Sequence, residues 1–93
     1  MIDLAVRLTA EFLGTLLLVL TIVATGGSSV FTGLVLAVII FLIAGVSGGH
    51  VNPAVSFAMF LSGSLPASTF IAYAVVQLLG GLTAVYAYRA TVM

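Results

Sequence analysis

Charged residues and cysteine are what this 93-residue sequence has least of. Two basic and two acidic side chains make up 4% of the chain, whereas soluble domains carry about 25% charged residues. The four charges lie near the ends: Asp3, Arg7, Glu11 and Arg89. Residues 12–88 carry no charge apart from any proton on His50. A water-facing surface cannot be built from such a sequence, and without a basic cluster we expect no nucleic-acid partner.

The absence of cysteine excludes disulfides, thiolate metal sites and thiol redox chemistry. The sequence also offers no nucleophile–base pair, no carboxylate dyad and no cluster of metal ligands, which are the features that enzymes use. We therefore expect no catalytic residue, no metal, no cofactor and no enzyme activity. The solvent that suits this composition is the lipid bilayer.

What the sequence does contain is 63% hydrophobic residues, arranged in runs long enough to cross a membrane. A helix needs about 20 apolar residues to span the hydrocarbon core. The predicted spans are residues 4–24, 30–46 and 66–89, separated by stretches rich in glycine and serine. The third span begins at Pro66, which suits the first turn of a helix. We expect a multi-pass integral membrane protein, and the particular membrane is left open.

A fourth helical segment, residues 53–61, is too short to cross. It would extend about 14 Å at 1.5 Å per residue, roughly half of the hydrocarbon thickness. Asn52 is a favoured N-cap, and Pro53 suits the first helical position. Gly48 and Gly49 permit an irregular backbone, which membranes tolerate only where protein buries it or water solvates it. We expect a re-entrant loop and half-helix that line a wet space; a surface turn outside the membrane is the alternative.

Small residues recur at four-residue spacing in all three spans, which lets helix backbones approach closely in lipid. The pairs are Ala10 and Gly14, Gly33 and Ala37, and Gly80 and Ala84. Together they favour packed helices over separate anchors.

Three blocks of sequence resemble the aquaporin and glycerol-facilitator (major intrinsic protein) family in order and spacing. Residues 10–15 read Ala-Glu-Phe-Leu-Gly-Thr, and residues 47–55 read Ser-Gly-Gly-His-Val-Asn-Pro-Ala-Val. The third block is Tyr73, Gln77, Gly80 and Gly81. A lone Asn-Pro-Ala would be a weak signal, but the blocks cover nearly the whole chain. The resemblance implies an all-α membrane protein with three transmembrane helices and one re-entrant half-helix, so that residues 1–93 form a single half-aquaporin domain.

The Asn-Pro-Ala motif, formed by Asn52, Pro53 and Ala54, is the expected pore constriction. The amide of Asn52 can donate hydrogen bonds, and the half-helix adds about half a positive charge at its tip. Two facing tips would orient a passing water, interrupt proton hopping and repel cations. The alternative for Asn52 is a plain N-cap without a channel.

The loop before the motif is expected to supply backbone carbonyl acceptors along one pore wall. The candidates are Gly48, Gly49, His50 and Val51. For the ring of His50, hydrogen bonding to nearby backbone is the alternative to pore lining or pH sensing. The resemblance implies that Glu11 accepts hydrogen bonds from loop N–H groups and that Gln77 gives similar support. The alternative for Glu11 is a position at headgroup level, paired with Arg7.

The family also has a narrow filter that includes an arginine just after its second-half motif. By motif spacing, the candidate filter positions are Thr32, Ile40, Gly49 and Val55. Val55 directly follows the motif, so a homodimer would place no arginine at the constriction. We expect a wider and more apolar filter, which leaves selectivity among water, small polyols and gases open.

The family's channel consists of two halves that are inverted relative to each other, and this sequence contains one Asn-Pro-Ala motif. Two copies inserted in opposite orientations could complete a pore. Arg7 and Arg89 lie near opposite ends, which gives almost no orientation bias. The expected function is passive passage of water or small neutral solutes, with the bilayer and a second half-channel as partners. The alternatives are one fixed orientation, a fragment or split-channel subunit that needs a distinct second half, and a non-conducting structural protein.

Overall fold

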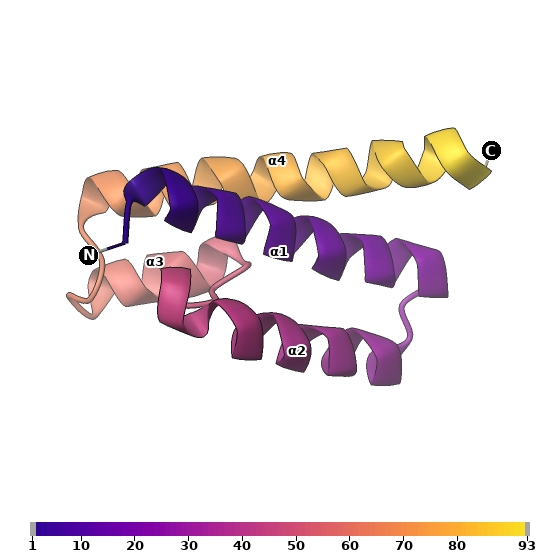
Figure 1. Ribbon diagram of the computed structural model, residues 1–93, viewed down its shortest axis with the longest axis horizontal. Helices are drawn as coiled ribbons and strands as arrows, with labels where there is room; N and C mark the ends of the chain where they lie inside the picture. The colour runs from indigo at the N-terminus through magenta and orange to yellow at the C-terminus, as the bar shows by residue number, and fades with distance from the viewer. Residues whose placement is uncertain (1, 93) are drawn as a thin grey trace.

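The computed structural model describes residues 2–92, which form four α-helices (Figure 1). The helices are α1 (Leu4–Thr25), α2 (Ser29–Ser47), α3 (Pro53–Leu61) and α4 (Ala67–Val92). By length and composition α1, α2 and α4 can each cross a membrane, and α3 is the shorter fourth helix. The predicted all-α membrane fold is therefore confirmed.

The helix ends follow local capping chemistry. The Ser28 hydroxyl accepts a hydrogen bond from the Phe31 N–H at 3.3 Å, so α2 begins one residue earlier than predicted. The bounds of α3 agree with the sequence prediction. α4 begins one residue after Pro66 and continues beyond Arg89 to Val92, because neither glycine nor proline follows to stop it.

The helices pack so that α3 turns back into the bundle. α1 contacts both α2 and α4, and α3 contacts α4. Figure 1 shows that α3 begins near the middle of the molecule and runs back toward the end at which α1 begins. The two termini lie at opposite ends of the long axis, which measures 41 Å. That length matches a bilayer of about 40–45 Å including its headgroups.

Two glycines set the close approaches around α1. A Cβ at Gly80 would lie 2.6 Å from the carbonyl oxygen of Phe12, so α4 crosses α1 backbone to backbone. A Cβ at Gly14 would lie 2.7 Å from a methyl carbon of Val51, so α1 also fits tightly against the loop. Gly33, by contrast, has open space beside it. Of the three small-residue pairs, the one in α2 is therefore not explained by packing within the chain.

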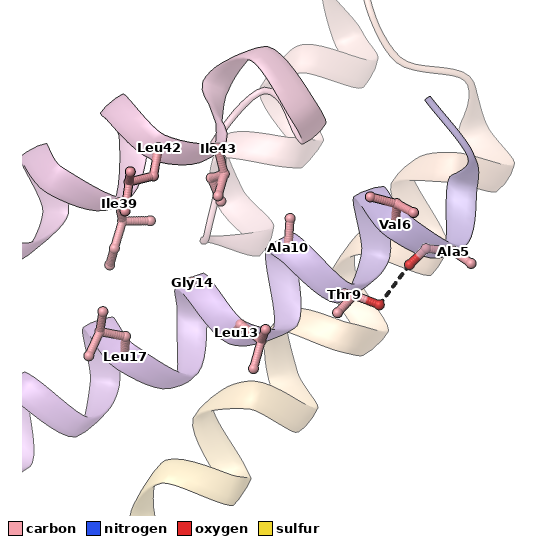
Figure 2. Close-up of a pocket in the computed structure, with 10 residues that line it drawn as sticks. All are labelled: Ala5, Val6, Thr9, Ala10, Leu13, Gly14, Leu17, Ile39, Leu42 and Ile43. Atoms are coloured by element: carbon pink, nitrogen blue, oxygen red, sulfur yellow. Dashed lines mark hydrogen bonds between the residues drawn. The ribbon is translucent and has the colours of Figure 1, made fainter. Parts of the chain in front are cut away.

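The burial pattern is the reverse of that in a soluble protein. The largest fully buried side chains include Glu11, Gln77 and Tyr73, whereas Phe41 is 85% exposed. A groove of about 540 Å³ between α1 and α2 faces outward and is lined by apolar side chains and Thr9 (Figure 2). The Thr9 hydroxyl already donates to the carbonyl of Ala5 at 2.8 Å. The polar chemistry of this molecule therefore lies inside the bundle.

Candidate functional site

The candidate site begins with the loop of residues 48–52 that connects α2 to α3. Gly48 and Gly49 adopt φ angles of 95° and 65°, and Val51 adopts φ 46°. A left-handed conformation is a genuine outlier for a β-branched residue, with a cost of about 1–3 kcal/mol. Val51 is only 3% exposed. The surrounding structure must therefore hold this loop in place.

The group that holds it is the carboxylate of Glu11, which is fully buried. Its Oε1 accepts a hydrogen bond from the Val51 N–H at 2.7 Å, and its Oε2 accepts one from the His50 N–H at 3.1 Å. The Ser47 hydroxyl donates to Oε2 at 2.6 Å, and Gln77 Nε2 donates to Oε1 at 3.0 Å. Four donors match the acceptor capacity of an ionised carboxylate. One side chain of α1 thus joins the end of α2, the loop and α4.

Arg7 is directed to Tyr73 and not to the carboxylate one turn away. Its Nε donates to the Tyr73 hydroxyl at 3.2 Å, and that hydroxyl donates to the Ser47 carbonyl at 2.7 Å. Glu11 is surrounded by the donors named above and has no exposed surface. The alternative position of Glu11, at headgroup level and paired with Arg7, is therefore not the one that the structure shows.

Ser56 of α3 is a further member of the polar cluster and is fully buried. Its Oγ accepts a hydrogen bond from Gln77 Nε2 at 2.9 Å and lies 2.8 Å from His50 Nδ1. The Ser56 hydroxyl can donate one hydrogen bond and accept two, so it can serve Gln77 and the His50 ring at the same time. The ring of His50 also lies against Tyr73, with 5.3 Å between centroids. Its partner is therefore a side chain and not the backbone.

Ser47 and Tyr73 entered from the sequence only through the family resemblance, and Ser56 was not singled out. One signal for Ser56 was available, because it is the one polar residue in Pro53–Leu61. The roles of Ser47 and Tyr73 depend on contacts between residues 26 positions apart, which local sequence patterns do not encode.

Asn52 stands at the tip of the half-helix with its side chain exposed. Its Oδ1 accepts a hydrogen bond from the Ala54 N–H at 2.8 Å, and Pro53 occupies the first turn of α3. The Asn52 amide group donates to no other group within residues 2–92. Over the same part of the chain, the carbonyls of residues 48–51 accept no hydrogen bond. The tip thus offers amide donors beside a row of backbone acceptors.

The four candidate filter residues do not converge within one chain. A Cβ on Gly49 would lie 3.4 Å from the Cα of Ile40, so these two positions are adjacent. Val55 is half-buried in the first turn of α3. Thr32 precedes Ile40 by eight residues of α2, which is about 12 Å along the helix. Its hydroxyl is buried without a hydrogen-bond partner in the described part of the chain.

A second groove, of about 740 Å³, adjoins the half-helix tip. Val51, Asn52 and Pro53 form one part of its lining, and side chains of α1 and α4 form the rest. Thr15 Oγ1 and Gln77 Oε1 both belong to lining residues, and both are buried without a partner within residues 2–92. Unlike the outward groove of Figure 2, this one has Asn52 and Arg89 in its lining, while Thr15 Oγ1 and Gln77 Oε1 lie beneath its surface.

Comparison with known proteins identifies the family of this chain. The sequence matches the Major intrinsic protein family over residues 2–93. The chain belongs to this family. Major intrinsic proteins are integral membrane channels and not enzymes, so the expectations of a membrane location and of no enzyme activity are confirmed. No solved structure matches the chain.

Three curated major intrinsic proteins illustrate the similarity. Aquaporin Z of Brucella melitensis biotype 1 is 37% identical over 84% of this chain and 40% of its own length. The probable aquaporin PIP2-8 of Arabidopsis thaliana is 36% identical over 90% of this chain and 36% of its own length. The glycerol uptake facilitator protein-like 6 of Lactiplantibacillus plantarum is 36% identical over 89% of this chain and 42% of its own length. The chain thus spans about two-fifths of the length of these relatives.

Proposed function

We propose that this chain is one half of a passive transmembrane channel for water or small neutral solutes, and that a second half-channel completes its pore. The observation that carries the proposal is the tip of α3, where the Asn52 amide is exposed and donates to no other group of residues 2–92. A polar donor at this depth in lipid is costly unless water or protein meets it.

The tip suits a neutral solute and disfavours a cation. The aligned peptide dipoles of α3 place about half a positive charge at its N-terminus, and the Asn52 amide adds donors beside it. A water that passes would turn its oxygen toward these donors and accept successive hydrogen bonds from them. Its protons would point away, which interrupts proton hopping. The carbonyls of residues 48–51 would accept hydrogen bonds from the solute on its way to the tip.

The buried polar cluster supports the tip in this proposal. Glu11 and Gln77 would hold the loop in the conformation that exposes its carbonyls, and Ser56 would link the half-helix to both. Val55 stands directly after the motif and adds no charge there. We therefore propose a constriction that is wide enough to admit small polyols as well as water.

Osmotic shrinkage of liposomes that contain the purified chain tests the proposal. We expect faster shrinkage than in protein-free liposomes. Asn52→Asp should lose this excess rate, because aspartate keeps the N-cap but replaces the amide donor with a carboxylate. Ser28→Asp is the matched control, since it places the same charge at a different helix cap. A pore made by copies of this chain alone is refuted if the wild-type liposomes shrink no faster than protein-free liposomes, and the role of Asn52 is refuted if Asn52→Asp leaves their excess rate unchanged.

A second candidate is a subunit that conducts only with a different half-channel. The position of Val55 favours it, because a partner with an arginine after its own motif would supply a charge that this chain does not. A reporter on the C-terminus separates the two cases. Signal from both sides of the membrane supports pairs of identical inverted chains, and signal from one side supports a distinct partner.

A further inference from the structure

The carbonyl row of residues 48–51 faces away from the buried carboxylate that holds the loop. The His50 N–H donates to Glu11 Oε2 at 3.1 Å, and the Val51 N–H donates to Oε1 at 2.7 Å. In a planar trans peptide the carbonyl points opposite to the N–H of the next residue, and no peptide bond within residues 2–92 is cis. The carbonyls of Gly49 and His50 therefore point away from Glu11, and the charge of Glu11 lies directly behind them.

Oxygens arranged in this way suit a cation. Rows of backbone carbonyls replace the hydration shell of potassium in the filters of potassium channels, and no hydrogen bond within residues 2–92 occupies the carbonyls of residues 48–51. The negative charge of Glu11 behind the row adds to this attraction. The tip of α3 opposes it at the Asn52 end with about half a positive charge, and Val55 adds no charge there. At the Gly48 end of the row, the tip is too far away to oppose the attraction equally.

Arg7 lies at this Gly48 end of the row. Its Nε donates to the Tyr73 hydroxyl at 3.2 Å, and this hydroxyl donates to the Ser47 carbonyl at 2.7 Å. The two distances add to 5.9 Å, so Nε lies no farther than this from the carbonyl that immediately precedes the row. The guanidinium carbon also lies 5.6 Å from the ring centroid of Tyr73, which is fully buried. Because arginine is always charged, these two contacts hold a full positive charge beside the start of the row.

The contact with Tyr73 lets Arg7 balance the charge of Glu11 without pairing with it. Within residues 2–92, Nε is the one atom of the Arg7 guanidinium that donates a hydrogen bond. The four donors that meet Glu11 come from other residues. A direct ion pair would compete for the carboxylate lone pairs that hold the loop. Glu11 thus keeps its hydrogen bonds, while Arg7 offsets its charge at longer range.

We propose that Arg7 is a specificity-determining residue of this half-channel: its fixed charge offsets that of Glu11 at the Gly48 end of the carbonyl row, so that the row serves neutral solutes and does not bind cations. This inference rests on the proposed function, because it concerns the solutes that the half-channel rejects. Arg7 and the tip of α3 then place positive charge at both ends of the row. Val55 leaves the motif without a charge, and Arg7 supplies one from α1.

Potassium entry into liposomes tests the charge of Arg7. A unit charge about 6–10 Å from a binding site changes its affinity for a monovalent cation by about 10- to 100-fold at an effective dielectric constant of about 20. Arg7→Gln keeps an amide donor for Tyr73 and should raise potassium entry above the wild-type rate by about this factor. Arg7→Lys keeps the charge and should stay at the wild-type level. Arg89→Gln is the matched control and should not raise potassium entry, since it removes the same charge sixteen residues, or about 24 Å, beyond Tyr73 in α4.

The carbonyls themselves give a readout that needs no complete pore. The ¹³C resonances of the carbonyls of residues 48–51 are followed in nanodiscs during titration with potassium chloride, with N-methylglucamine chloride as the control for ionic strength. In the Arg7→Gln protein, we expect these resonances to shift at potassium concentrations about 10- to 100-fold lower than in the wild type. Amide hydrogen exchange at His50 and Val51 checks that Glu11 still holds the loop in each variant.

The outcomes separate this inference from the proposed function. If Arg7→Gln liposomes shrink faster than protein-free liposomes but admit no more potassium than the wild type, the role of Arg7 is overturned and the channel stands. Equal potassium entry with Arg89→Gln also overturns it, because the cause is then the net charge of the protein. So does potassium entry without a change in the carbonyl titration, because the cations then pass elsewhere.

The carbonyl titration decides the role of Arg7 even if wild-type liposomes conduct no water. That result refutes a pore made by copies of this chain alone. A shift at lower potassium concentration in the Arg7→Gln protein then still supports the role of Arg7, and identical titrations of the two proteins overturn it.

Discussion

Glu11→Gln is the substitution for which the structure gives the sharpest expectation. The carboxylate accepts four hydrogen bonds, two at each oxygen. Glutamine has the same shape but offers one acceptor oxygen and one donor group. If its oxygen keeps the Val51 N–H and Gln77, its NH₂ group faces the His50 N–H and the Ser47 hydroxyl. The reverse orientation places the NH₂ group against Val51 and Gln77.

The first orientation is the less costly one and sets the lower bound. The Ser47 hydroxyl can turn its proton to the Ile43 carbonyl, which lies 3.4 Å away, and accept from the new amide. The His50 N–H has no such choice and is left facing a donor. A hydrogen bond to a charged group contributes about 1.5–3 kcal/mol, so the loss of the one at the His50 N–H costs at least about 1.5–3 kcal/mol. That is a substantial part of the 5–15 kcal/mol that typically stabilises a fold.

Amide hydrogen exchange in detergent micelles or nanodiscs measures this loss where it occurs. A destabilisation of about 1.5–3 kcal/mol, at 1.4 kcal/mol per factor of ten, should accelerate exchange at His50 and Val51 by at least about 10- to 10²-fold. Asp3→Asn is the control, since it neutralises an exposed acid at the start of α1. If both amides of the Glu11→Gln protein exchange within about threefold of the wild-type rates, the carboxylate does not hold the loop and the reasoning is refuted.

Three further substitutions test the packing and the rest of the cluster. Gly80→Ala should destabilise the protein by about 1–3 kcal/mol in denaturant titrations, because its Cβ would lie 2.6 Å from the Phe12 carbonyl oxygen; Gly33→Ala, with open space beside it, should be neutral or stabilising by up to about 1 kcal/mol. Equal effects of the two substitutions would contradict the close crossing of α1 and α4. Ser56→Ala should cost about 1–3 kcal/mol and shift the ¹⁵N resonances of the His50 ring, and an unchanged spectrum would contradict the hydrogen bond between Ser56 and His50.

Local chemistry explains how much of the fold could be predicted. The start of α3 was predictable because Asn52 and Pro53 form a cap that depends only on adjacent residues. The length of the three long helices followed from apolar runs and from the glycines that end two of them. The C-terminal end of α4 was less predictable, since nothing after Arg89 specifies a stop.

The polar cluster was harder to predict because it joins residues far apart in sequence. Glu11 stood out as an ionisable group in an apolar run, but its contact with Gln77 spans 66 positions. Arg7 is one turn from Glu11, and a pair between them was the alternative to a buried Glu11. The fold instead brings Tyr73 to Arg7. A candidate site was thus recognisable from the sequence. Its hydrogen bonds could not be predicted, because they depend on how α1 packs against α4.

The proposal that two half-channels make one pore is tested most directly by the density dependence of liposome permeability. If a pore needs two chains, the excess rate of osmotic shrinkage at low protein density should rise with the square of the number of chains per liposome, and Asn52→Asp should abolish it. A rate that rises in simple proportion to density would contradict assembly from two halves. A rate equal to that of protein-free liposomes at every density would contradict the claim that this chain alone can form the pore.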